Sequence, residues 1–137
     1  MGWPEWWWRH KKPAATQVTG QFATYFSKLQ KLSQDSSLWV DGAEPPSQQA
    51  LTLAQAFMQQ LEKDHFPPTG VVASGEGGAG IYFIDGNKYA DLECLNSGAI
   101  LGVISNRRDR PTAYEVEQDA GGLAHASLRI REWMTRS

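Results

Sequence analysis

The spacing of the hydrophobic residues changes once along this chain, near Pro67-Pro68. Before that point apolar residues recur every three or four positions, which is the pattern of amphipathic helices. After Gly70 apolar and polar residues alternate in several short runs, which is the pattern of half-buried strands. Strands that follow one another through short turns pair antiparallel. The sequence therefore predicts an α+β fold and excludes a parallel sheet with crossover helices.

Two helices are predicted in the first half of the chain and one at its end. The first covers about residues 17–32, and the second starts after Ser47, whose hydroxyl can cap a helix N-terminus, and is ended by Pro67-Pro68. Gly121-Gly122 is predicted to break the last strand. The closing helix then follows from the spacing of Leu123, Ser127, Ile130 and Met134.

The alternating runs predict an antiparallel meander of four to five strands. Asp85-Gly86-Asn87 forms a tight turn between two of them, because Asp-Gly readily supplies the positive φ angles of a hairpin. The clearest run, residues 88–95, places Ala90, Leu92 and Cys94 on one face and Tyr89, Asp91 and Glu93 on the other. The remaining strands are expected at residues 71–73, 81–84, 99–105 and 112–118.

Composition limits the number of domains and the class of protein. The 137 residues are 41% hydrophobic, which suits a single α+β domain, expected over residues 15–137 after a Trp-rich basic tail at residues 1–14. The single Cys94 excludes an intramolecular disulfide and a cysteine-based zinc site. No run approaches the ~20 apolar residues of a membrane span, and the order of residues at the N-terminus is unlike a secretory signal. A cytoplasmic location is therefore expected.

Charge is segregated along the chain although its sum is only −2. Residues 1–32 carry five bases and one acid, residues 33–93 carry nine acids and two bases, and residues 94–137 carry six bases and five acids. The basic residues form two clusters, one in the tail and one in an exposed loop at residues 106–111. Segregation of this kind can set the choice of partner and the rate of approach.

The tail combines its basic residues with four of the six tryptophans. Trp and Arg dominate the energetics of protein interfaces, so docking on a partner is favoured over an interfacial membrane anchor. Packing of the indoles on the chain's own domain stays open as the simplest alternative. The predicted partner-binding residues are Trp3, Trp6, Trp7, Trp8, Arg9, Lys11 and Lys12 in the tail, and Arg107, Arg108 and Arg110 in the loop.

Three patterns that could carry chemistry are weaker. Gly75–Gly80 matches a dinucleotide-binding motif, but strand-forming residues follow it, so no helix N-terminus would hold a phosphate. A Cys94–His125 dyad is possible, although a small buried thiol is the simpler interpretation. Four carboxylates could form a metal-binding face of the sheet, but a third strand should separate the pairs Asp91/Glu93 and Glu115/Glu117.

These observations favour a non-enzymatic protein-interaction module that forms a hetero-complex with a protein partner. Neither a cofactor nor a metal is expected. Two alternatives stay open. One is a small metal-dependent hydrolase or nuclease that uses the carboxylate face, and the other is a nucleic-acid-binding accessory protein that uses the basic clusters.

Residues 38–134 also resemble a set of uncharacterised small bacterial α+β proteins often encoded near toxin–antitoxin or phage-defence genes. Val40 departs from the pattern, because it splits the usual Trp-Asp-Gly sequence. The resemblance implies a bacterial or mobile-element origin and an antitoxin-like or defence-accessory role, and it transfers no catalytic residue. The matching residues are Trp39, Asp41-Gly42, Pro45-Pro46, Ala54, Phe57, Pro67-Pro68, Tyr114-Glu115-Val116 and residues 128–133.

Overall fold

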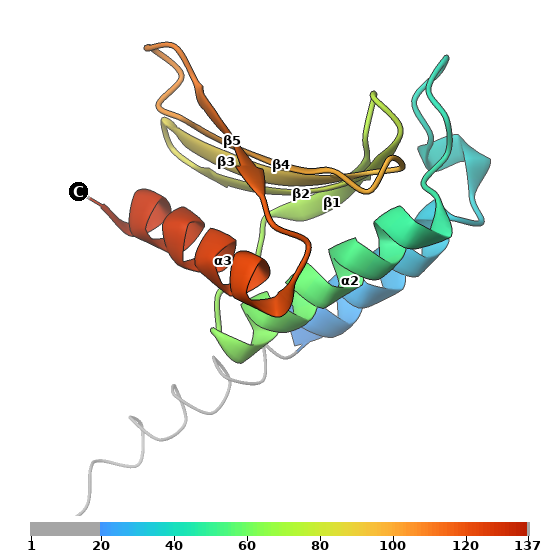
Figure 1. Ribbon diagram of the computed structural model, residues 1–137, viewed down its shortest axis with the longest axis horizontal. Helices are drawn as coiled ribbons and strands as arrows, with labels where there is room; N and C mark the ends of the chain where they lie inside the picture. The colour runs from blue at the N-terminus through green and yellow to red at the C-terminus, as the bar shows by residue number, and fades with distance from the viewer. Residues whose placement is uncertain (1–19, 137) are drawn as a thin grey trace, which may run out of the picture.

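A five-stranded antiparallel sheet lies at the centre of the fold, and helices cover one of its faces (Figure 1). The computed structural model describes residues 20–136, and the strands follow one another in the order β1-β2-β3-β4-β5. The predicted α+β class, with its meander and closing helix, is confirmed. The first helix includes residues 20–32, and the other elements are η1 (Ser36–Leu38), α2 (Gln48–Lys63), β1 (Gly70–Ala73), β2 (Gly78–Asp85), β3 (Lys88–Leu95), β4 (Ile100–Ser105), β5 (Thr112–Val116) and α3 (Ala120–Thr135).

The strand register sorts the side chains as the sequence predicted. In β3, Ala90, Leu92 and Cys94 are buried beneath the helices, whereas Tyr89 and Asp91 point to the opposite face. Two-residue periodicity decides this outcome, because successive side chains of a strand leave opposite faces of a sheet. Among the described residues no helix covers that second face, which therefore stays open (Figure 1).

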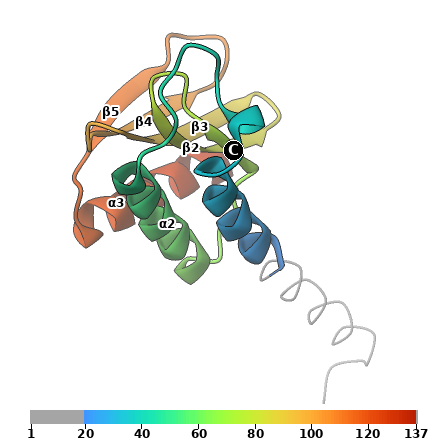
Figure 2. The same cartoon turned by 90° about the vertical axis from the view of Figure 1, so that its right-hand side faces the viewer.

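The core lies between the sheet and the three helices. Figure 2 shows α3 below β5 and the first helix, in blue, below the other edge of the sheet, with α2 between them. Each helix contributes one apolar stripe, as amphipathic periodicity requires. The largest fully buried apolar side chains are Phe22, Leu29, Phe57, Met58, Leu61, Ile81, Leu92, Ile100 and Ile130.

Helix α2 begins where the sequence predicted and ends before the proline pair. The Ser47 hydroxyl accepts a hydrogen bond from the Ala50 N–H at 3.1 Å and caps the N-terminus. At the other end His65 adopts a positive φ of 56°, and the Phe66 N–H bonds back to the carbonyl of Leu61. This left-handed cap ends the helical hydrogen bonding at Lys63, so Pro67-Pro68 is not needed to stop it.

The start of α3 differs from the prediction. Gly121-Gly122 does not break a strand; both glycines lie in the first turn of α3, and β5 already ends at Val116. Asp119 caps this helix by accepting from the Gly122 N–H at 2.7 Å, and the low helix propensity of glycine matters little in a capped first turn. A Cβ at Gly122 would overlap the backbone carbonyl of Glu117, which explains the absence of a side chain there.

Candidate functional site

Three of the ten predicted partner-binding residues fall within the described chain. Arg107, Arg108 and Arg110 lie in the turn between β4 and β5, here called the basic turn (residues 106–111), and all three are exposed. The other seven lie outside the described residues: Trp3, Trp6, Trp7, Trp8, Arg9, Lys11 and Lys12.

The basic turn is held in shape by hydrogen bonds of its own. The Asn106 side-chain oxygen accepts from the backbone N–H groups of Arg108 (3.0 Å) and Asp109 (2.8 Å). The Asn106 amide also donates to the Asp109 carboxylate at 2.8 Å. These bonds occupy Asn106 and Asp109 within the turn and leave the arginine side chains to point outward.

Arg107 has a backbone conformation that residues with a side chain rarely adopt. Its φ is 65°, in the left-handed region where glycine or asparagine is usual, and the Ser105 hydroxyl accepts from its N–H at 2.9 Å. Strain of this kind persists where the surroundings hold it, and it gathers at functional sites. The exposed turn thus keeps an arginine at a position where glycine would be more stable.

Helix α3 extends the basic surface next to the turn. A shallow cavity of about 170 Å³ separates Arg110 from Trp133 of α3. The Trp133 indole donates to the backbone carbonyl of Tyr89 at 3.2 Å, and the Lys88 ammonium lies 5.7 Å from the centre of its ring. An aromatic ring with one cation over it therefore lies beside the basic turn.

A second stacked pair continues this surface along α3. The Arg129 guanidinium lies 3.9 Å from the centre of the Tyr114 ring. That ring fits across Gly102 on the neighbouring strand, where a Cβ would overlap it. The stack presents Arg129 in a fixed orientation, on the same side of the sheet as Trp133.

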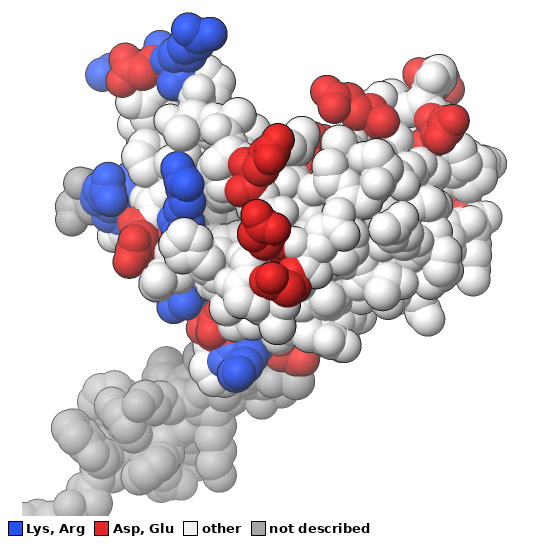
Figure 3. Space-filling model, in the orientation of Figure 1, with Lys and Arg blue, Asp and Glu red and all other residues white. Residues whose placement is uncertain are grey.

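Charges are separated on the surface (Figure 3). Basic side chains, with a few acidic ones among them, gather at the β4–β5 turn and over α3, whereas a run of acidic side chains alone lies over the end of β5 and the segment that leads to α3. The acidic run consists of Glu115, Glu117 and Asp119. Basic side chains therefore outnumber acidic ones at this end of the molecule, and a row of carboxylates borders it.

The carboxylates predicted as a possible metal site are divided as expected. β4 lies between the two pairs, because Glu93 is opposite Leu101 and Leu101 is opposite Glu115. In the described part of the chain, no group of three or more His, Cys, Asp or Glu side chains is placed to hold a metal ion.

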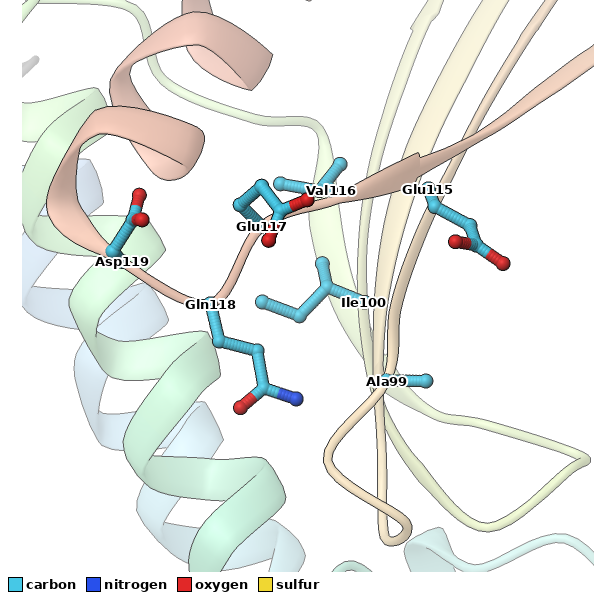
Figure 4. Close-up of a pocket in the computed structure, with 7 residues that line it drawn as sticks. All are labelled: Ala99, Ile100, Glu115, Val116, Glu117, Gln118 and Asp119. Carbon is cyan, nitrogen blue, oxygen red and sulfur yellow. The ribbon is translucent and has the colours of Figure 1, made fainter.

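The acidic run lines a cavity of about 520 Å³ at the edge of the sheet (Figure 4). Glu115 points away from Glu117 and Asp119, and Asp119 is occupied as the N-cap of α3. Gln118 donates to the carbonyl of Gly98 and closes the lower side of this cavity as drawn in Figure 4. Charged side chains on an edge strand also oppose pairing with another sheet, which suits β5 at this position.

The open face holds a buried carboxyl group. The Tyr89 hydroxyl donates to Asp91 Oδ2 at 2.6 Å, while Asp91 Oδ1 is buried and has no hydrogen-bond partner among the described residues. Burial raises the pKa of Asp91 above its ordinary value of 3.8, and the neighbouring Glu93 raises it further against the opposing effect of the Tyr89 hydrogen bond. Burial also raises the pKa of Tyr89, so this hydroxyl keeps its proton.

We expect Asp91→Asn to be at least as stable as the native protein at pH 7. A raised pKa in the folded state means that the favourable contribution is present at low pH and is lost as the pH rises through that pKa. The amide does not ionise, so the variant does not lose this stability, and its oxygen can still accept from Tyr89. The advantage of the variant over the native protein in unfolding free energy should therefore shrink toward pH 3. Urea denaturation at both pH values measures it, with Asp85→Asn, at an exposed aspartate, as the control. A less stable Asp91→Asn protein at pH 7 would contradict this account.

The remaining candidate residues do not come together. Gly78 and Gly80 lie within β2, so the glycine-rich segment leads into a strand and not into a phosphate-binding helix. Cys94 is fully buried, and burial raises the pKa of its thiol to about 12. The thiol therefore stays protonated at neutral pH, and His125 on α3 is exposed.

The sequence did not place Arg129, Trp133 and Lys88 beside the basic turn. A signal existed in the alternation of bases and apolar residues over 128–131, but the register that stacks Tyr114 on Gly102 is needed to place it.

None of the helices in the described chain is long and apolar enough to cross a membrane. Searches against protein-family models, curated proteins and solved structures gave no match.

Proposed function

We propose that this protein is a protein-interaction module that binds an acidic surface of a partner protein through the basic turn and the adjoining face of α3. The observation that carries the proposal is the strained, internally hydrogen-bonded turn that exposes Arg107, Arg108 and Arg110, the last of which lines a small cavity together with Trp133. Arginine and tryptophan are the residues that most often supply interface hot spots. The tail tryptophans lie outside the described residues and stay predicted partner-binding residues. The resemblance noted above supports an antitoxin-like or defence-accessory role.

The charge pattern favours a protein partner over a nucleic acid. A nucleic acid is a long polyanion that extends beyond its binding site, so carboxylates at the border of the site would repel it. Here Glu115, Glu117 and Asp119 border the basic surface. A protein partner can instead match a basic area and an acidic rim with its own opposite charges, which gives specificity and a faster approach. The small size of the basic surface also favours a protein partner over a nucleic acid.

Affinity capture from extracts of the source cells tests the proposal with matched variants. The first variant, Arg107→Gln/Arg108→Gln/Arg110→Gln, removes three charges from the turn. A control variant, Lys63→Gln, removes a charge from the last turn of α2. We expect the turn variant to lose at least about 90% of the captured partner and the control to retain it, with unchanged thermal unfolding in both. A third variant, Trp6→Ala/Trp7→Ala/Trp8→Ala, tests the tail.

The outcomes separate the candidate functions. Equal capture by the turn variant and the native protein would contradict the role of the turn. Capture that nuclease treatment abolishes, with affinity falling steeply with salt, would show a nucleic-acid-binding protein instead. If the Trp variant folds normally and captures the partner fully, the tail has no part in the contact.

We expect Arg107→Gly to make the protein more stable and to weaken partner binding. Glycine adopts a φ of 65° without strain, so the gain should be about 0.5–1 kcal/mol, while loss of one interface arginine should weaken binding about tenfold. His65→Gly is the matched control, because His65 has a φ of 56° but lies at the end of α2. It should show a similar gain with no change in binding. Urea denaturation and quantitative capture measure both effects. A destabilised Arg107→Gly protein would contradict the assignment of strain.

A further inference from the structure

Exposed aliphatic side chains gather at one groove beside β1, the edge strand on the opposite side of the sheet from β5 and the basic turn. The described chain has five large hydrophobic side chains that are strongly exposed, and three of them, Leu38 (43%), Val40 (44%) and Val72 (46%), line this groove. It lies between β1, η1 and the end of the first helix and has a volume of about 530 Å³. We call it the β1 groove. Clustered exposed apolar groups of this kind mark interaction sites.

The floor of the β1 groove is an unpaired strand edge. Among residues 20–136, β1 pairs only with β2, so within this part of the chain no strand pairs with the backbone groups on its other side. The Ser74 N–H bonds to Gly78, and hydrogen bonding to one neighbour alternates along an antiparallel strand. Gly70 and Val72 therefore face β2, whereas the N–H and C=O groups of Val71 and Ala73 face the groove.

The rim of the groove is basic. Lys28 and Lys31 of the first helix line it together with a single carboxylate, Asp35. Asp35 already accepts from the backbone N–H (3.0 Å) and the hydroxyl (2.6 Å) of Ser37. Those hydrogen bonds and the charge of Lys31 lower the pKa of Asp35, so the acid is ionised and is engaged locally. The two lysines leave the groove with a net positive rim.

We propose that the β1 groove binds an extended segment of a partner protein, which adds as a strand beside β1. The segment would place aliphatic side chains against Val72 and Leu38 and a carboxylate near Lys28 and Lys31. Main-chain hydrogen bonds to Val71 and Ala73 would fix its register, as in other strand-addition complexes. A second copy of this chain fits less well, because symmetric pairing through β1 would bring the lysines of both copies into one interface. This site is independent of the basic turn.

The probe that tests this is a phage-displayed library of random dodecapeptides, selected on the full chain. Leu38→Glu/Val72→Glu adds acid to the groove, and Ile84→Glu/Leu128→Glu makes the same change at the two other strongly exposed aliphatics, both 42% exposed. We expect selected peptides to alternate apolar and acidic residues. They should bind the groove variant at least about tenfold more weakly and the control variant within about twofold of the native protein. Thermal unfolding checks that both variants fold.

Two further measurements complete the test. Lys28→Glu/Lys31→Glu should weaken the acidic peptides by a similar factor, whereas the Gln variant of the basic turn should leave them unchanged. Selection of no alternating peptide, or equal binding to the groove variant, would overturn the proposal. So would sedimentation that shows a native dimer lost in Leu38→Glu/Val72→Glu, since a second copy would then cover the groove. Failure here leaves the capture experiment on the basic turn unaffected.

Discussion

Gly78→Ala is expected to destabilise the protein by about 3–5 kcal/mol, a large fraction of the roughly 5–15 kcal/mol that stabilises a single domain. Gly78 begins β2 with a φ of 143° and lies opposite Leu95 of β3. A Cβ there would overlap the backbone carbonyl of Cys94 and lie 2.9 Å from Leu95 Cα. Both atoms belong to the backbone of the central strand, so neither can move aside without separating β2 from β3.

A second glycine separates this overlap from backbone strain alone. Gly42 has a φ of 81°, and no atom lies within 4 Å of a Cβ placed on it. Gly42→Ala should therefore lose only about 1 kcal/mol, the usual effect of a side chain in the left-handed region. Urea denaturation of both variants measures the difference. If the two substitutions had equal effects, the close approach of β3 to Gly78 would be wrong.

Asp64→Ala is expected to lose about 2 kcal/mol of unfolding free energy, because it removes a polar link between α2 and α3. The Asp64 carboxylate accepts from the Ser127 hydroxyl at 2.7 Å and from Gln60 at 3.0 Å, and it lies 3.6 Å from the Arg131 guanidinium. Ser127 is fully buried, so its hydroxyl would lose its partner. Asp64→Asn keeps an acceptor for Ser127 and should lose less.

The effect of Asp64→Ala should depend on pH. Burial opposes ionisation of Asp64, but the hydrogen bonds from Gln60 and Ser127 and the charge of Arg131 outweigh it and lower its pKa below 3.8. A lowered pKa in the folded state means that the contribution is present above the unfolded pKa and is lost as the pH falls through the folded one. The difference between native protein and variant should thus shrink below about pH 4. A difference that grows on acidification would contradict the assignment.

Local sequence signals predicted much of the fold. The bounds of β3 and the start of α2 after Ser47 follow from residues that are adjacent in the chain, namely a two-residue alternation and a capping hydroxyl. The predicted start of α3 is wrong, because Gly121-Gly122 indicates a break in the last strand unless Asp119 is recognised as a helix cap. In each case the deciding interaction is within a few residues.

The candidate sites depend on contacts between distant segments and were predicted only in part. The bases of the turn are visible as a run in the sequence, but their position beside Trp133 requires the packing of α3 against the sheet. The β1 groove combines Leu38 and Val40, from the segment between the first helix and α2, with Val72 on an edge strand. No periodicity shows that these side chains stay exposed together, because exposure is decided by what the rest of the chain leaves uncovered.

Site-specific photo-crosslinking identifies the molecule that the basic turn contacts. A photoreactive phenylalanine analogue replaces Arg108 in the basic turn, or Gln48 on the exposed start of α2 as the control, in full-length protein expressed in the source cells. We expect irradiation to join position 108, and not position 48, to one partner protein. The Arg107→Gln/Arg110→Gln changes should remove this product. Cross-linking from position 48 alone, or cross-linking from position 108 only to nucleic acid, would contradict it.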